Sequence, residues 1–270
     1  MTDAPTPTGW GRPPFSTTRI GPSPDPARRN EDAVRVRPGL AVVVDGAGTP
    51  KRYRLGCDHT VAWYSHHLAD VMVESYADRS ADQRDALASA IARVRALHPE
   101  CSLEGGSPSA TIACFRTNGA TMEYLVQCDA AILLQQADGS ASMVTDDHID
   151  HVDRTRAEEL RNHPDGFWLP QGDPAVARHA VVGEVPLDRL RGVVACSDGI
   201  TRALDRLGLH AVSGLVDSCL TDAENLIDEI RRAEADGTPR PGKVHDDATL
   251  ALLTERTRVP SPGTNFHHCL

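Results

Sequence analysis

Hydrophobic residues occur in two kinds of run along the chain, one typical of buried strands and one with the period of a helix. The first strand-like run is LAVVV at residues 40–44, which is nearly continuous and rich in β-branched residues. Such a run predicts a buried strand. It ends on Asp45-Gly46, where a glycine lets the chain turn sharply and its carbonyl approach another group. Asp-Gly is also an ordinary turn dipeptide, so this segment alone leaves both a turn and a site open.

Two stretches after this strand have helical periodicity. Their apolar positions are Val61, Tyr64, Leu68 and Val71 within residues 56–75, and Leu87, Ile91, Val94 and Leu97 within residues 81–98. Each set places its members on one face of a helix, so two amphipathic helices are predicted.

The period then changes to that of short strands. Four runs, SATIACFRT (109–117), TMEYLVQCD (121–129), AAILLQQ (130–136) and ASMVTDD (141–147), are accompanied by Asn-Gly and Asp-Gly turn signals. This pattern predicts an antiparallel meander. Residues 150–178 are polar and mixed in character, and we expect an irregular lobe there.

The remaining segments alternate in blocks. Strands are predicted within residues 178–185, 191–198 and 246–255, and helices near 199–207, 211–219 and 221–235. Strands and helices in blocks, without regular βαβ alternation, indicate an α+β fold. No internal repeat or long linker divides the chain. We expect a disordered arm over residues 1–18, one domain over residues 19–256 and a tail over residues 257–270.

Charge and cysteine content narrow the class of protein. The chain has 28 Lys and Arg against 38 Asp and Glu, for a net charge of −10. This balance argues against nucleic acid and anionic membranes as partners. No apolar stretch approaches the length of a membrane span, and the first residues do not resemble a signal peptide. The seven cysteines show no C-x-x-C spacing, so we expect reduced core thiols in a cytoplasmic protein rather than a zinc or disulfide framework.

The histidines of the first predicted helix region offer no clear ligand set. His59, His66 and His67 lack the i, i+4 pair and the following ligand of a zinc-binding helix. We therefore expect them to be solvated or to pack within the helix layer.

Three acidic segments share one design. VVACSDG ends in Asp198-Gly199 as LAVVVDG ends in Asp45-Gly46, and Asp246-Asp247 precedes the apolar run of the last strand. If these strands are neighbours, Asp45, Asp198 and Asp246 converge at one edge, where their repulsion requires protons or cations. Carboxylate ligands suit Mg(II) or Mn(II). Two such ions about 4 Å apart can activate a water and clamp a phosphoryl group.

Six segments in this order resemble the metal-dependent protein phosphatases of the 2C type, the PPM family. They are NEDAVRVRPGLAVVVDGAG, GGSPSATIACF, CDAAILL, VTDDH, CSDGI and HDDATLALL. The resemblance covers residues 19–256. It implies a four-layer α-β-β-α sandwich, in which two antiparallel sheets are flanked by helices.

The resemblance also implies roles for individual residues. Asp45 is similar to the carboxylate that bridges two catalytic metals, and the Gly46 carbonyl would bind one of them. Asp198 and Asp246 would bind the first ion, and Glu31 the second, directly or through water. Asp129 would help Asp198 to hold a weak third ion. Asp247 stands where many members have Asn, which implies a supporting role.

Three departures from the family pattern bear on activity. CDAA at residues 128–131 replaces Gly-Asp-Ser-Arg, and DGAG at residues 45–48 has one glycine fewer than usual. The phosphate-binding arginine of the family falls on Ala27 here, so Arg28 or Arg29 would serve instead. Guanidinium groups suit phosphate, although adjacent surface arginines are often simply solvated.

The resemblance thus implies a monomeric, cytoplasmic Mn(II)- or Mg(II)-dependent phosphatase for phosphoserine and phosphothreonine in proteins. Residues 150–178 occupy the place of the variable flap, which tends to decide substrate choice. Two alternatives stay open. One is a pseudophosphatase, a binding or regulatory module with weak or no catalysis, which the altered loops favour. The other is a hydrolase of small phosphoesters.

Overall fold

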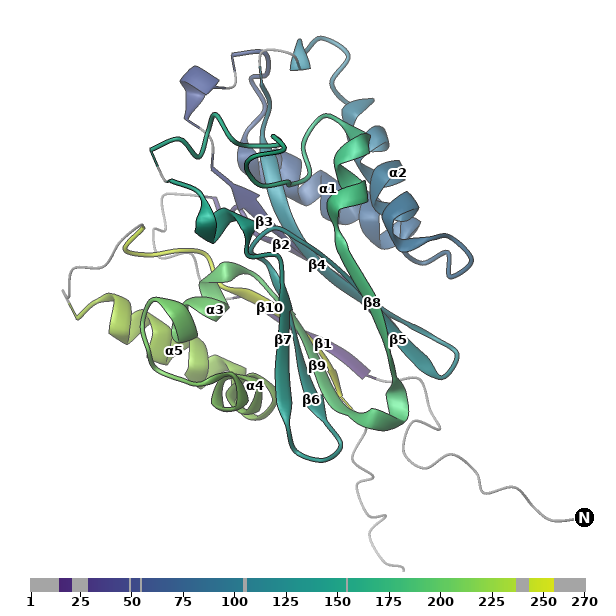
Figure 1. Cartoon of the computed structure of the whole chain (residues 1–270), viewed down its shortest axis with the longest axis vertical. Helices are drawn as coiled ribbons and strands as arrows, with labels where there is room; N and C mark the ends of the chain where they lie inside the picture. Colours follow the sequence, from purple (N-terminus) through teal and green to yellow (C-terminus); the bar gives the residue numbers. More distant parts are fainter. Residues whose placement is uncertain are drawn as a thin grey trace, which may run out of the picture.

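The protein is a sandwich of two antiparallel sheets with helices on both outer faces (Figure 1). The computed structural model describes residues 15–20, 29–48, 50–53, 55–103, 106–153, 155–236 and 243–254, with the backbone alone for 15–20 and 51. This architecture confirms the predicted α+β class and the four-layer sandwich. Among these residues, no helix combines the length and apolar content that a membrane span requires.

Each sheet has five strands. The first contains, in spatial order, β2 (Ala33–Arg37), β3 (Leu40–Ala47), β4 (Ser109–Asn118), β5 (Thr121–Gln127) and β8 (Val181–Pro186). The second contains β1 (Phe15–Ile20), β10 (Thr249–Thr254), β9 (Leu190–Cys196), β6 (Ala131–Gln136) and β7 (Ala141–Thr145). All neighbouring strands are antiparallel.

Two groups of helices cover the outer faces. The first sheet is covered by α1 (Val61–Ser75) and α2 (Gln83–Arg95), and the second by α3 (Asp198–Asp205), α4 (Val212–Thr221) and α5 (Ala223–Glu234) (Figure 1). Short 3-10 turns are η1 (Lys51–Tyr53), η3 (His148–His151), η4 (Pro174–His179) and η5 (Leu187–Arg189). The side chains of Thr60 at the start of α1 and Asp82 at the start of α2 accept hydrogen bonds from backbone N–H groups of the first turn, which satisfies donors that the helix leaves open.

The continuous apolar run of β3 follows from its position between two hydrophobic layers. Val42 and Val44 pack in the core under α1 and α2, whereas Ala41 and Val43 pack in the core between the sheets. Because successive side chains point to opposite faces of a strand, a strand covered on both faces needs apolar residues at every position. The same alternation places Asp45 on the inter-sheet side of β3, at the end of that core.

The predicted meander is wrong in one respect. β4 pairs with β5, and β6 pairs with β7, but β5 and β6 belong to different sheets. The chain crosses from one sheet to the other at Cys128 and Asp129. Turn signals mark hairpins, and they carry no information about a change of sheet between hairpins. β1 and β2 were not predicted as separate strands, and the expected arm over residues 1–18 overlaps with β1; its first fourteen residues lie outside the described ranges.

Helix ends also differ from the predictions in detail. α2 ends at Arg95, and Leu97 beyond it is exposed rather than part of the buried face. His59 precedes α1 instead of lying on it. Cys114, Cys128, Cys196 and Cys219 are buried core thiols, as expected. The tail over residues 257–270, which contains Cys269, lies outside the described ranges.

One buried arginine ties the helix layer to the first sheet. Arg116 on β4 is 2% exposed, and its Nε lies 2.6 Å from Oε2 of Glu123 on β5. Its two terminal nitrogens donate to the backbone carbonyls of Tyr76, Asp78 and Ala81. These carbonyls belong to the connection between α1 and α2. Because one guanidinium serves all four acceptors, its loss removes the partner of three carbonyls and the counter-ion of Glu123, which keeps the Asn118 amide as a donor at 2.7 Å.

We expect Arg116→Met to lower the free energy of unfolding by about 3–5 kcal/mol, since it leaves the mostly buried Glu123 carboxylate without its counter-ion. Arg93→Met is the matched control, because Arg93 pairs with Glu74 at the surface at 2.6 Å with both side chains about half exposed. That change should cost at most about 1 kcal/mol. Urea denaturation of both variants measures the difference, and equal losses would contradict the anchoring role of Arg116.

Candidate active site

The acidic segments meet at one edge of the sandwich because of strand order and register. β9 and β10 are antiparallel neighbours, with Cys196 opposite Leu250. Asp198 follows the end of β9, and Asp246 precedes the start of β10, so both lie at the same end of the second sheet. β3 brings Asp45 to this edge from the first sheet. The structure thus brings together three carboxylates that the sequence placed on separate strands.

The carboxylates affect one another strongly. Burial raises the pKa of Asp45 well above its usual value, and the charges of Asp32, Asp198, Asp246 and Asp129 raise it further. Burial and the charge of Asp246 likewise raise the pKa of Asp198. Because Coulomb interactions fall with distance and with solvent screening, these effects indicate that five carboxylates lie close together, with Asp32 buried and the other four partly buried.

The two glycines that follow the aspartates allow this close approach. A Cβ at Gly46 would lie 2.8 Å from the backbone oxygen of Glu31, and one at Gly199 would lie 1.8 Å from that of Asp247. Any side chain at either position would push the acidic segments apart. The Asp-Gly pairs therefore serve here as contact points between segments rather than only as turns.

Backbone contacts hold Glu31 in this arrangement. Its N–H donates to Oδ2 of Asp247 at 2.8 Å, and its carbonyl accepts from the Ser65 hydroxyl of α1 at 2.5 Å. Asp247 thus fixes the chain at Glu31, in line with a supporting role. The Glu31 side chain is partly buried.

Asp32 is an acidic residue beside the cluster for which the sequence motifs implied no role in metal or phosphate binding. It is buried, and its Oδ2 accepts a hydrogen bond from the Ser197 hydroxyl at 2.9 Å. That hydroxyl in turn accepts from the Thr249 N–H at 3.1 Å. Burial raises the pKa of Asp32 to about 7, although the bonds to Thr249 and Ser197 oppose the shift. Asp32 therefore links the start of β2 to β9 and β10 directly beside the cluster.

Cationic side chains border the cluster on the side of α3 and residue 243. Lys243 Nζ lies 3.1 Å from Oδ1 of Asp246, and Arg206 lies 3.6 Å from Oδ2 of Asp198. Arg202 is 3.9 Å from Asp246 but is paired more closely with Glu234. These ion pairs involve Asp198 and Asp246, and against the effect of burial the charges of Asp246 and Asp45 raise the pKa of Lys243.

The donor set fits divalent cations. Burial, followed by neighbouring charge, raises the pKa of Asp32, Asp45, Asp129 and Asp198, and Oδ1 of buried Asp32 has no hydrogen-bond partner. Oxygen donors with excess negative charge are the environment that Mg(II) and Mn(II) prefer. Asp45, Asp198, Asp246 and the Gly46 carbonyl are the groups at this edge that could hold such ions.

The turn that carries Asp129 has an unusual backbone. Cys128 has a φ of 66°, in the left-handed region that favours glycine. Its N–H donates to Oδ2 of Asp146 at 3.4 Å, and its side chain packs with Phe167 and Leu169. Burial and the charge of Asp198 raise the pKa of Asp129 to about 7. The altered motif therefore still directs Asp129 toward the cluster.

Of the two arginines predicted to bind phosphate, only Arg29 belongs to the described residues. Arg28 lies outside the described residues, and Arg29 is exposed. Arg29 is near His66: burial lowers the pKa of that imidazole, and the charge of Arg29 contributes to the shift. Both arginines stay predictions as phosphate ligands.

Residues 150–178, predicted as a flap-like lobe, are attached to the first sheet at several points. Arg161 donates to the Ser109 hydroxyl at 2.7 Å, and Gln171 donates to the Ser107 carbonyl at 2.9 Å. The Trp168 ring stacks on His179 at 3.8 Å between centroids. Because Ser109 pairs with Ala47 just beyond Asp45 and Gly46, the lobe lies beside the acidic edge.

Two tighter groups of potential ligand atoms occur elsewhere in the described chain, each within 4.8 Å. The first is Asp146, Asp147 and His148, of which Asp147 and His148 are exposed and Asp146 is already engaged with Cys128 and His148. The second consists of Cys57, His59, His98 and Cys101. Its ligand atoms are nitrogen and sulfur, whereas those of the carboxylate cluster are oxygen.

Comparison with solved structures and with family models identifies the fold and the family of the chain. A search of curated protein sequences found no match. Among solved structures, the serine/threonine phosphatase PstP/Ppp of Mycobacterium tuberculosis is similar at 14% identity and a TM-score of 0.59, over 90% of this chain and 99% of that chain. PppA, a key regulatory component of T6SS in Pseudomonas aeruginosa, is similar at 19% identity and a TM-score of 0.57, over 90% and 97%.

A third structure, the catalytic domain of the serine threonine protein phosphatase PstP in complex with two manganese ions, is similar at 16% identity and a TM-score of 0.53, over 89% and 97%. Identities this low show a common fold and nothing further. The family model for protein phosphatase 2C, however, matches residues 28–228. Because that match spans most of the chain, the protein belongs to the protein phosphatase 2C family.

Proposed function

We propose that the protein is a metal-dependent phosphatase that hydrolyses phosphoserine and phosphothreonine in proteins. The observation that carries this proposal is the largely buried carboxylate cluster around Asp45, built from both sheets at one edge. Such a concentration of negative charge is costly in a domain that binds no cations. Membership of the protein phosphatase 2C family supports phosphatase activity at such a centre.

Asp45 is the residue on which the centre depends, because its pKa responds to all the other carboxylates of the cluster. We assign Asp45, Asp198, Asp246 and the Gly46 carbonyl to metal binding, with Glu31 at the second ion and Asp129 at a weaker third. When bound, two divalent ions lower the pKa of a water and neutralise phosphate oxygens. Asp32 holds the end of β9 through Ser197, which positions Asp198 without direct contact to substrate.

The choice of metal follows from the donor set and from one similar structure. Carboxylate and carbonyl oxygens suit both Mn(II) and Mg(II), and PstP, which shares the fold, was solved with two manganese ions. We therefore propose Mn(II) or Mg(II). A cytoplasmic, monomeric protein acting on a phosphoprotein remains part of this proposal.

A pseudophosphatase is the second candidate, because the loop at residues 45–48 and the turn at Cys128 depart from the family pattern. The retained carboxylates favour the enzyme. A hydrolase of small phosphoesters differs from a protein phosphatase only in substrate, so side-by-side assays on p-nitrophenyl phosphate and a phosphothreonine peptide separate the two.

Asp45→Asn should reduce Mn(II)-dependent hydrolysis of a phosphothreonine peptide by at least about 100-fold, because Asn keeps one acceptor oxygen but removes the charge that balances the cations. The matched control is Asp217→Asn, an exposed residue of α4 on the outer helix layer, which should retain wild-type turnover. If the wild type hydrolyses neither substrate at millimolar Mn(II), the binding-module candidate replaces the enzyme.

Stability in the absence of metal should depend on pH through the raised carboxyls. The pKa of Asp32 and that of Asp129 are about 7 in the folded protein against 3.8 as the reference value. Their contribution to stability is therefore complete below about pH 4 and is lost as the pH rises to about 7. Urea denaturation with a chelator should show a lower free energy of unfolding at about pH 8 than at about pH 5.

Asp32→Asn should make that pH dependence weaker, while Asp217→Asn should leave it unchanged. An identical dependence in the wild type and in Asp32→Asn would show that Asp32 does not titrate as the cluster geometry requires.

The turn at Cys128 can be tested separately from catalysis. Ala and Gly both remove the buried thiol, but only Gly relieves the left-handed conformation, which costs other residues about 1–2 kcal/mol. Cys128→Gly should therefore be more stable to urea than Cys128→Ala by about 1 kcal/mol. Equal stability of the two variants would contradict the backbone conformation assigned to this turn.

A further inference from the structure

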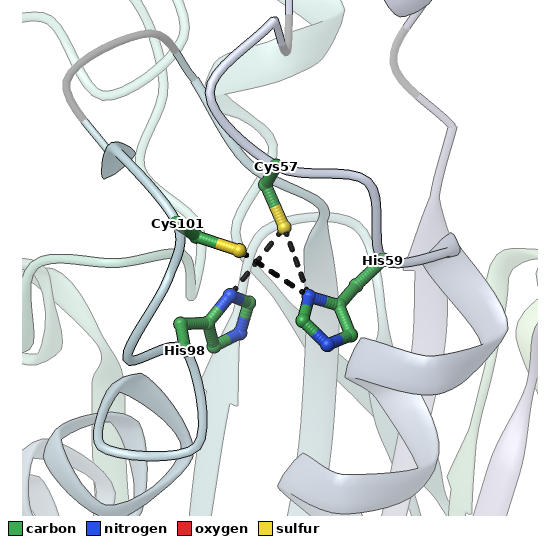
Figure 2. A group of neighbouring side chains, drawn as sticks. All are labelled: Cys57, His59, His98 and Cys101. Atoms are coloured by element: carbon green, nitrogen blue, oxygen red, sulfur yellow. Dashed lines mark hydrogen bonds between the residues drawn. The ribbon is translucent and has the colours of Figure 1, made fainter.

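Four side chains with nitrogen and sulfur donors converge near the ends of α1 and α2. Figure 2 shows the thiols of Cys57 and Cys101 and the imidazoles of His59 and His98 facing a common centre. Their ligand atoms all lie within 4.8 Å of one another. The expectation that every cysteine is an ordinary core thiol does not account for this cluster.

The cluster is assembled from two separate segments. Cys57 and His59 lie between η1 and α1, and His98 and Cys101 follow the C-terminal end of α2. Cys57 is 5% exposed and His98 is 6% exposed, while His59 and Cys101 are partly buried. Cys101 lies 44 positions after Cys57, so the arrangement is a product of the packing of α1 against α2.

The distances match those between the ligands of one tetrahedral ion. Cys57 Sγ lies 3.3 Å from His59 Nδ1 and 3.4 Å from His98 Nδ1, and Cys101 Sγ lies 3.5 Å from His59 Nδ1. Bonds of 2.3 Å to sulfur and 2.0–2.1 Å to nitrogen at tetrahedral angles place sulfur and nitrogen ligands about 3.6 Å apart. A two-iron cluster spreads its ligands over two metal atoms, whereas these four surround a single point.

Neighbouring rings hold the imidazoles in this orientation. The Trp63 ring packs against His59 at 4.0 Å and against His98 at 4.7 Å between centroids. Burial lowers the pKa of His98 to about 4, with further lowering by His59 and His67, and the neutral imidazole is the form that binds a metal. An open pocket lined by Arg95, His98, Cys101, Ser102 and Leu103 adjoins the cluster and gives an ion access from solvent.

We propose that Cys57, His59, His98 and Cys101 bind one structural zinc ion. Two thiolates and two imidazoles are a donor set that selects Zn(II) over Mg(II) or Mn(II). Four protein ligands leave no open coordination position, which distinguishes a structural site from a catalytic one. On binding, the two thiols lose their protons to solvent and bind as thiolates.

The ion would join the start of α1 to the end of α2. The segment before Cys57 follows Asp45 and Gly46, and the segment after Cys101 leads to Ser109 on β4, which pairs beside them. Zinc would therefore fix two connections that flank the acidic edge. This role is independent of the proposed phosphatase activity, because the carboxylate cluster contains no sulfur or imidazole ligand.

The test measures metal content and the spectrum of a cobalt derivative in the full chain, purified without a histidine tag. We expect one zinc ion per chain after dialysis against a weak chelator. Replacement of zinc by Co(II) should produce a thiolate-to-cobalt charge-transfer band, which oxygen ligands at the acidic edge cannot give. Zinc affinity, measured by competition with a chromophoric chelator, should fall by more than about 100-fold in Cys57→Ser and in Cys101→Ser.

Cys219→Ser is the matched control, because Cys219 is a buried thiol of α4 in the opposite helix layer. It should keep the zinc and the cobalt band. Wild-type protein without zinc, without a charge-transfer band, or with a disulfide between Cys57 and Cys101 would overturn the proposal. These readouts need no variant to fold and no phosphatase activity, so failure of the zinc site and failure of the proposed function are separate results.

Discussion

The repulsion among the carboxylates clustered around Asp45 is the destabilising force that the rest of the structure must oppose. Burial and neighbouring carboxylates act in the same direction at Asp45, and Lys243, whose charge interacts with that of Asp45, forms its ion pair with Asp246. The cluster holds together because its members are attached to rigid neighbours: Asp45 to a strand packed on both faces, and Asp198 to the first turn of a buried helix. The hydrophobic core between the sheets thus stabilises the fold against the repulsion at the acidic edge.

Local sequence patterns predicted most helices and strands, because the buried face of each one determines the spacing of its apolar residues. The run at residues 40–44 is continuous because α1 and α2 cover one face of β3 and the second sheet covers the other. The acidic motifs identified Asp45, Asp198 and Asp246, since each is joined to a recognisable strand. The division into two sheets came from the family resemblance and not from these patterns.

Other features depend on contacts between distant segments, which local patterns do not record. Asp32 stands beside Glu31 in the sequence. The hydrogen bond from Ser197, 165 positions away, gives Asp32 an environment that differs from that of Glu31. The sequence predicted reduced core thiols and no zinc site for the two pairs of Cys and His residues, because C-x-H and H-x-x-C do not follow common zinc spacings. They meet because α1 and α2 run side by side, and each pair alone resembles ordinary surface or core residues.

The pairing of β1 with β10 sets the order in which the molecule can be completed. Phe15 lies opposite Thr254 and Ile20 opposite Thr249, so nearly the whole described chain separates the two strands. Asp246 belongs to the same late segment, three residues before β10. During synthesis, the first sheet and its two helices can form while the second sheet still lacks two strands. The nascent chain therefore has no complete acidic centre until the segment that carries Asp246 and β10 leaves the ribosome.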